Sequence, residues 1–144
     1  MLETLAARVK LAEGDRAGAI EILTAARAKY PESMGVAYDY ADALLSVKRA
    51  RESLDLLIKL AKEAPDDPRL YEMQARAYSQ LGKRADQHRA LAEMYLLKGS
   101  LPAAIEQLRL AQKAGDADFY VLSAVDARLR ELQGRYDSEL RRRR

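Results

Sequence analysis

The sequence of 144 residues contains no cysteine and no tryptophan, and its only histidine is His88. Without cysteine the chain forms no disulfide and offers no thiolate nucleophile. A single imidazole is too few for a metal site built from two or three histidines, and it leaves an H-E-x-x-H peptidase motif incomplete. We therefore predict a chain with no catalytic residue, no metal ligand set and no cofactor of its own.

Long apolar runs are also missing. No stretch of about eighteen apolar residues occurs, so no membrane-spanning helix is predicted. The first residues, 1–10, mix apolar and charged side chains, whereas a targeting segment places basic residues before an apolar core. We expect neither membrane insertion nor a targeting signal in this sequence.

The body of the chain carries almost no excess of positive or negative charge. The formal net charge is +3, but residues 141–144 are four arginines, so the remaining residues sum to −1. Proteins that bind nucleic acid spread lysine and arginine along a face where several phosphates are met together. A run of arginines at one end does not provide such a face, and we predict no nucleic-acid partner.

Apolar residues recur at spacings of three and four, and no stretch alternates with the period of two that marks a strand. This pattern predicts an all-α fold with helices at residues 2–12, 16–29, 34–46, 50–63, 68–80, 84–97, 101–113 and 117–133. Each helix is roughly thirteen residues long, a length that is marginal in isolation, so the helices must pack on one another. We expect the basic segment 134–144 to form a disordered tail.

The predicted helix ends carry residues suited to ending or starting a helix. Pro31 and Pro65 end helices, because proline disfavours a helical predecessor and cannot donate a backbone hydrogen bond. Asp15 and Ser100 are predicted to cap the helices that follow them by accepting from free backbone amides. Single glycines, which tolerate the positive φ common at helix C-termini, stand at three ends: Gly14, Gly82 and Gly99.

A period of 34 residues connects these markers, since it separates Pro31 from Pro65, Gly14 from Lys48 and Lys48 from Gly82. Three rows follow the same period: Ala7, Ala41 and Ala75; Leu23, Leu57 and Leu91; Ala26, Leu60 and Met94. The period resembles that of tetratricopeptide repeats, whose antiparallel helix pairs stack into a superhelix. We predict such a superhelix of about eight antiparallel helices over residues 1–133.

The frame fails beyond Gly82, because it places Asp116 where a glycine is expected. A shift of seventeen residues, to Gly99, restores it, so the helix at 84–97 serves as second helix of one repeat and first helix of the next. The segment 117–133 then closes the stack. Its apolar residues are predicted to face inward and its charged residues outward: Leu122, Val125, Leu129 and Leu132 inward; Asp126, Arg128, Arg130 and Glu131 outward.

First-helix residues line the inner surface of such a superhelix. On the 34-residue frame the candidates for a peptide groove are Arg8, Tyr38, Asp42, Arg69, Glu72, Arg76 and Gln80. This mixed, amphipathic lining suits an extended or helical peptide. A solvated face without a ligand is the alternative, because charged residues on an exposed helix need no special purpose. Among the other tyrosines, Tyr71 can also face the groove, whereas Tyr78 is predicted to lie in the core.

Two further features are interpreted as structural. His88 aligns with Ile20 and Leu54 on the repeat frame, which predicts a partly buried packing role rather than a ligand role. Repeat proteins that hold the C-terminal carboxylates of chaperones carry a clamp of lysines and asparagines. The corresponding positions here carry other residues, which argues against that type of adaptor: Thr4, Arg8, Asp39, Arg69 and Met73.

From Tyr71 onward the sequence is more specific than a generic repeat. The strongest runs are 87–95, 103–112, 114–120 and 126–132. These runs closely resemble the C-terminal repeat domain of the BepA/YfgC-like zinc metalloproteases of bacterial envelopes, whereas residues 1–66 match only as ordinary repeats. In that family a signal peptide and a zinc-binding peptidase domain precede the repeats. The zinc ligands and catalytic glutamate have no matching positions here, so the resemblance implies zinc only in that preceding domain.

The resemblance implies a periplasmic location and a role in outer-membrane protein quality control. Our hypothesis is a non-catalytic module for protein interaction and substrate recruitment, with assembly components, clients and the cognate peptidase domain as partners. A structural buttress or gate of the peptidase domain is one alternative. A free-standing adaptor of a secretion or pilus system is the other.

Overall fold

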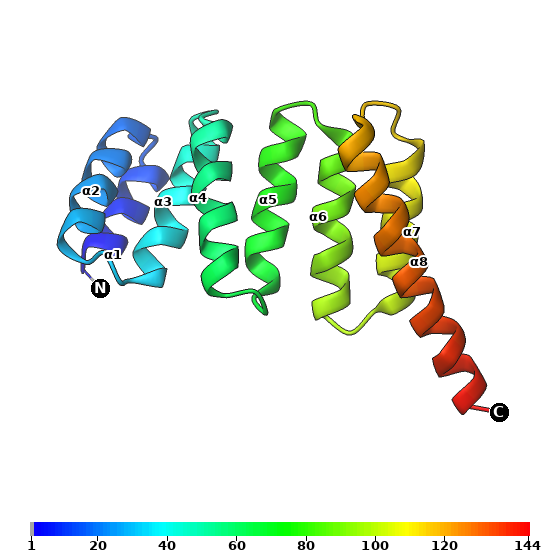
Figure 1. Ribbon diagram of the computed structural model, residues 1–144. Helices are drawn as coiled ribbons and strands as arrows, with labels where there is room; N and C mark the ends of the chain where they lie inside the picture. The colour runs from blue at the N-terminus through cyan, green and yellow to red at the C-terminus, as the bar shows by residue number, and fades with distance from the viewer. Residues whose placement is uncertain (1) are drawn as a thin grey trace. The chain divides into compact units, whose positions relative to one another are not determined.

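The computed structural model describes residues 2–144, and these form eight helices and no strand; Met1 lies outside the described residues. The helices are α1 (Leu2–Ala12), α2 (Arg16–Lys29), α3 (Met34–Ser46), α4 (Ala50–Glu63), α5 (Pro68–Gln80), α6 (Arg84–Leu97), α7 (Leu101–Lys113) and α8 (Phe119–Arg142) (Figure 1). The all-α prediction is confirmed, and the first seven helices have the predicted bounds. The chain divides into two compact units, one ending at Ile58 and the other running from Lys59 to Arg144.

In the first unit, α1, α2 and α3 pack on one another. Their shared cluster is built mostly from small side chains, namely Ala7, Ala19 and Ala43 around Leu23. Small residues let helix axes approach closely, and the larger side chains of Leu11, Ile20, Ile22 and Tyr40 pack around this contact. The buried hydroxyl of Ser53 donates a 2.8 Å hydrogen bond to the carbonyl of Ala41, which joins the start of α4 to α3.

The three predicted rows of repeat residues are buried in the structure. The alanine row is fully or almost fully buried, and so are Leu23 and Leu57 of the second row. Leu91 is half-buried, whereas every member of the third row is buried. The 34-residue period therefore predicts the packing positions of both units from sequence alone.

The turns between paired helices share one backbone geometry. Gly14, Gly82 and Gly99 have positive φ values of 82°, 71° and 85°, as predicted, and Lys48 adopts the same conformation at 63°. In each turn the following amide donates to the carbonyl five residues earlier: Asp15 to Lys10 at 2.8 Å, Arg49 to Leu44, Lys83 to Tyr78 and Ser100 to Tyr95 at 2.9 Å. This pattern is the Schellman motif, which satisfies carbonyls left over at a helix C-terminus.

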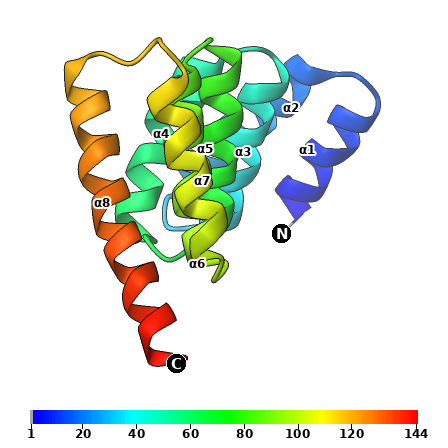
Figure 2. The ribbon, with the colours of Figure 1, turned by 90° about the vertical axis from the view of Figure 1, so that its right-hand side faces the viewer.

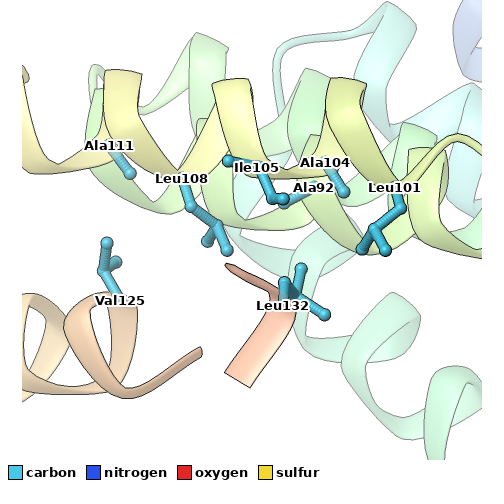
Figure 3. Close-up of a cluster of buried hydrophobic side chains, with 8 residues drawn as sticks. All are labelled: Ala92, Leu101, Ala104, Ile105, Leu108, Ala111, Val125 and Leu132. Carbon is cyan, nitrogen blue, oxygen red and sulfur yellow. The ribbon is translucent and has the colours of Figure 1, made fainter. Parts of the chain in front are cut away.

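In the second unit, α6 packs against both α5 and α7, as expected for a helix shared between two pairs, and α8 packs on α7 and α6. Figure 3 shows Leu108 of α7 and Val125 and Leu132 of α8 directed into one buried cluster. The cluster also contains the remaining inward residues of α6 and α7: Ala92, Leu101, Ala104, Ile105 and Ala111. Leu122, predicted to face inward, is instead partly exposed near the start of α8.

Two of the capping predictions have different outcomes. Asp15 caps α2, and its Oδ1 accepts from the amide of Gly18 at 2.9 Å. Ser100 occupies the N-cap position of α7 but its side chain makes no capping hydrogen bond, so that part of the prediction is wrong.

The N-terminus of α6 is capped from a distant part of the chain. Lys83 holds the N-cap position and has no side-chain capping bond. The carboxylate of Asp116, in the loop between α7 and α8, accepts instead from the amides of Arg84 and Ala85 at 2.5 and 2.9 Å. These two backbone hydrogen bonds lower the pKa of the Asp116 carboxyl below its ordinary value. A loop residue thereby joins the closing helix to the start of α6.

The predicted disordered tail at 134–144 is wrong, because α8 continues to Arg142. Figures 1 and 2 both show its last turns extending beyond the ends of α6 and α7. Tyr136 and Leu140 continue the helical spacing of Leu132, and no proline interrupts them. Arginines in the last turn also complement the negative end of the helix dipole. Basic composition alone was a poor guide to disorder here.

Candidate functional site

The predicted groove residues of the first unit lie on α1 and α3. Arg8 is exposed, and its Nη2 donates to Oδ1 of Asp39 at 3.3 Å. Tyr38 and Asp42 are half-buried on α3. The second carboxylate oxygen of Asp39 is buried and has no hydrogen-bond partner among the described residues. The structure thus brings Arg8 to the helix that carries the other two candidates.

The predicted groove residues of the second unit all lie on α5, and all four are exposed: Arg69, Glu72, Arg76 and Gln80. Arg69 pairs with the N-cap residue Asp67 at 3.2 Å. None of the four lines the cavity between α5, α6 and α8. Their role in ligand binding stays a prediction.

A cavity of about 310 Å³ lies within the second unit, between α5, α6 and α8. Its lining comes from four helices: Tyr71, Gln74 and Tyr78 of α5; Asp86, Arg89, Ala90 and Glu93 of α6; Leu108 of α7; Ala124 and Arg128 of α8. Small apolar groups and tyrosine rings are combined with charged groups. Pockets that bind peptides or small molecules have this mixture of an apolar lining and a few placed polar groups.

The strongest polar contact at the cavity joins α8 to α6. Arg128 donates from Nε and Nη2 to the two carboxylate oxygens of Glu93, each at 2.9 Å, and its Nη1 lies 2.9 Å from Glu131. The hydrogen bonds to Glu93 raise the pKa of Arg128 against the opposing effect of burial. Arg128 was predicted to face outward, and that prediction is wrong. The sequence pattern marks it as charged but does not show the carboxylate that α6 presents to it.

A second ion pair lies within α6, where Nη1 of Arg89 is 3.2 Å from Oδ1 of Asp86. With Glu93 and Arg128, the cavity is lined by two acids and two bases, so its formal charge is zero. Each guanidinium already donates to a carboxylate. The charges are therefore balanced internally and do not select an acidic or a basic ligand by themselves.

Tyr71 supplies a hydroxyl at the cavity. Burial is the main cause that raises its pKa above the ordinary value, and the negative charges of Glu93 and Asp66 add to it. The phenol therefore stays protonated at neutral pH and can donate. No hydrogen bond to this hydroxyl is found among the described residues. Tyr71, which was predicted to face the groove, lines this cavity, and so does Tyr78, which is half-buried.

Sequence reasoning missed the α6 side of the cavity, although the signal was present. Moving Arg69, Glu72 and Arg76 along by the seventeen-residue shift gives Asp86, Arg89 and Glu93, all of which line the cavity. The same shift that aligns the packing residues also aligns these charged positions. Once α6 serves as a first helix, its charged residues occupy the positions that the repeat frame assigns to the groove.

The other polar features have structural explanations. His88 is half-buried, and its Nδ1 lies 2.8 Å from Oε1 of Gln107, so it links α6 to α7 in a packing role. Across residues 2–144, no group of three metal-binding side chains lies together. None of the described helices is long and apolar enough to cross a bilayer.

Comparisons with known proteins agree with this architecture. Residues 10–77 match the tetratricopeptide repeat family. A thermophilic tetratricopeptide-repeat protein of Thermus thermophilus has a similar solved structure, with a TM-score of 0.52 and 20% sequence identity over 87% of this chain and 78% of that chain. No curated protein sequence matches the chain. The chain has an all-α tetratricopeptide-repeat fold, as predicted.

Proposed function

We propose that this chain is a protein-interaction module that holds a segment of another protein at the cavity between α5, α6 and α8. The observation that supports this most strongly is the cavity itself, which combines apolar and hydrogen-bonding groups within one compact unit. Domains with this repeat bind proteins or peptides as a rule. A rigid pocket built on helices positions its groups more precisely than a loop would.

The resemblance of the second half to BepA/YfgC-like metalloproteases supports a narrower version of the proposal. In this version the module serves a periplasmic zinc metallopeptidase in outer-membrane protein quality control. It recruits clients or assembly components, and the peptidase domain carries out the cleavage. Tethering then raises the effective concentration of the client at the peptidase, so modest affinity is sufficient.

A calorimetric titration tests this proposal. The folded chain is titrated with unfolded segments of outer-membrane proteins and with fragments of the assembly machinery. We expect saturable binding to at least one of them, and about tenfold weaker binding for Arg89→Ala, because Arg89 lines the cavity. The control is Arg109→Ala on α7, whose arginine lies 3.9 Å from an acid three residues earlier, Glu106, but is outside the cavity lining.

The two alternatives have their own readouts. Alanine at Tyr38, Arg69 and Arg76 would weaken docking of the peptidase domain if the repeats act as a buttress or gate. Recruitment at the cavity predicts instead that Arg89→Ala weakens client binding and leaves that docking unchanged. An adaptor of a secretion or pilus system would bind no client of the outer-membrane assembly route. A folded chain that binds none of these proteins would contradict the recruitment proposal.

A further inference from the structure

We propose that the cavity between α5, α6 and α8 accepts one aromatic side chain, phenylalanine or tyrosine, from the bound segment. This inference rests on the proposed function and adds the chemistry that selects the ligand. It depends on the size of the cavity, the composition of its walls and the pairing of its charges.

The size of the cavity favours one large side chain. At about 310 Å³ it lies at the lower end of the range for ligand pockets, roughly 300–1,000 Å³. That space is too small for a length of helix. It suits a single ring, and aromatic anchors of this kind dominate the energy of many peptide interfaces.

The walls favour an aromatic ring over an aliphatic chain. The apolar wall comes from three helices: the small side chains of Ala90 and Ala124 and the buried side chain of Leu108. The small side chains leave room between the helices. Tyr71 and Tyr78 contribute rings on the α5 side. Aromatic rings attract one another in edge-to-face or offset arrangements beyond the gain from buried area alone.

The charged groups at the cavity also favour a neutral, π-rich ligand. Arg89 and Arg128 are already bonded to Asp86 and Glu93, so a carboxylate ligand would have to displace an existing partner. A basic ligand would face the two guanidinium groups. A guanidinium paired at its edge still presents its planar face to an aromatic ring, and that cation–π contact needs no change in the ion pairs.

The hydroxyl of Tyr71 supplies a polar contact for the same ligand. It is protonated, lines the cavity and has no hydrogen-bond partner among the described residues. A backbone carbonyl beside the anchor, or the hydroxyl of a tyrosine anchor, can accept from it. One donor beside an apolar space fixes the orientation of an inserted ring.

The test uses short capped peptides of glycine, serine and asparagine that differ only in one central residue. Binding is followed by the NMR signals of the alanine methyl groups of the whole chain. We expect the phenylalanine peptide to bind at least about tenfold more tightly than the alanine peptide. Ring-current shifts are expected at the methyl groups of Ala90 and Ala124. Peptides with central aspartate or arginine are expected to bind no better than alanine.

A pair of variants on α8 sharpens the test. Ala124→Leu fills the cavity and should abolish the preference for phenylalanine. Ala127→Leu places the same side chain at an exposed position of the same helix and should leave that preference unchanged. The ring-current shifts in the unmodified chain need no variant, so the inference stays testable if Ala124→Leu fails to fold.

The outcomes separate this inference from the proposed function. Client segments that bind equally well with or without an aromatic residue, and equally well to the Ala124→Leu variant, would contradict the aromatic anchor but not the proposed interaction role. Preferred binding of the aspartate peptide would also overturn it. A folded chain that binds neither clients nor peptides would overturn both.

Discussion

The terminal helices of the two units, α1 and α8, are held to their neighbours in different ways. Within its unit α1 buries Ala7, and it exposes Leu2 at 81% and Leu5 at 58%. The start of α8 also exposes Phe119 at 79% and Tyr120 at 83%, but α8 buries Val125 and Leu132 completely and makes two hydrogen bonds to Glu93 of α6 through Arg128. Both helices carry apolar residues at helical spacing. The difference shows that the neighbouring helix, and not the sequence pattern alone, decides whether the apolar residues on one face of a helix are buried.

The polar contacts of the two regions differ in a parallel way. In the first unit, Arg8 and Asp39 meet through a single contact of 3.3 Å, and the arginine side chain is largely exposed. In the second unit, Arg128 and Glu93 meet through two hydrogen bonds of 2.9 Å, and Asp116 caps a helix that starts 32 residues earlier. The cavity lies in the second unit, and the two-point contact between Arg128 and Glu93 forms part of its lining.

The largest expected effect concerns the core between α7 and α8. Leu132→Ala should lower the free energy of unfolding by about 3 kcal/mol, because the fully buried side chain leaves a cavity. Leu5→Ala on α1 should cost less than about 0.5 kcal/mol, since that leucine is mostly exposed. Urea unfolding of both variants measures the contrast. Equal losses of unfolding free energy in the two variants would mean that Leu5 of α1 is buried in solution to the same degree as Leu132 of α8.

The next effect concerns the two ion pairs. Arg128→Met should cost about 1–2 kcal/mol of stability, because the pair with Glu93 has two hydrogen bonds but is only half-buried and partly screened. Arg8→Met should change stability by no more than about 0.5 kcal/mol. Double-mutant cycles with Glu93→Gln and Asp39→Asn give the coupling energies. Coupling of similar size in both pairs would contradict the distinction between the units.

The helix-ending turns offer a reciprocal test. Lys48→Gly in the first unit should raise the free energy of unfolding by up to about 1 kcal/mol, because glycine adopts a φ of 63° without steric cost. Gly82→Ala in the second unit should lower it by about 1 kcal/mol for the same reason. Thermal or urea unfolding measures both. Changes of the same sign in the two variants would show that the turn conformation is not the cause.

The smallest effect concerns the cap on α6 and depends on pH. The folded-state pKa of Asp116 is lowered from 3.8 by bonds to two amides, so its charged form stabilises the fold at neutral pH. Asp116→Asn should therefore be less stable than the parent chain above about pH 4. The difference should disappear as pH falls through the lowered pKa. Stability measured by urea unfolding between pH 7 and acidic pH shows this trend.

Ser100→Ala is the control for that experiment. Ser100 stands at an N-cap position without a capping bond, so its loss should leave stability nearly unchanged at every pH. A pH-independent difference for Asp116→Asn would contradict the role assigned to its charge.

Much of the fold could be predicted from the sequence, because the information is local and periodic. The 34-residue rows predicted the buried alanines, and the spacing of apolar residues predicted the bounds of seven helices. The predicted end of α8 was wrong, because an arginine-rich composition does not exclude a helix when Tyr136 and Leu140 continue the apolar spacing. Capping of α6 by Asp116 could not be predicted either, because the amides that donate to Asp116 lie more than thirty residues earlier in the sequence.

The candidate site was predicted only in part. Tyr71, predicted to face the groove, lines the cavity, and the seventeen-residue shift contains the positions of Asp86, Arg89 and Glu93. The direction of Arg128 could not be predicted, because helical periodicity classifies a charged side chain as outward. A carboxylate on a neighbouring helix, such as Glu93, reverses that expectation.

The sequence by itself determined the helices, their repeat period and the turns that end them, because each depends on residues within a few positions of one another. Only the tertiary structure decided which charged residues meet across helices and where a cavity is left between them. Such contacts depend on how α8 packs against α6 and α7, and that packing is fixed by the summed fit of many side chains from distant parts of the chain.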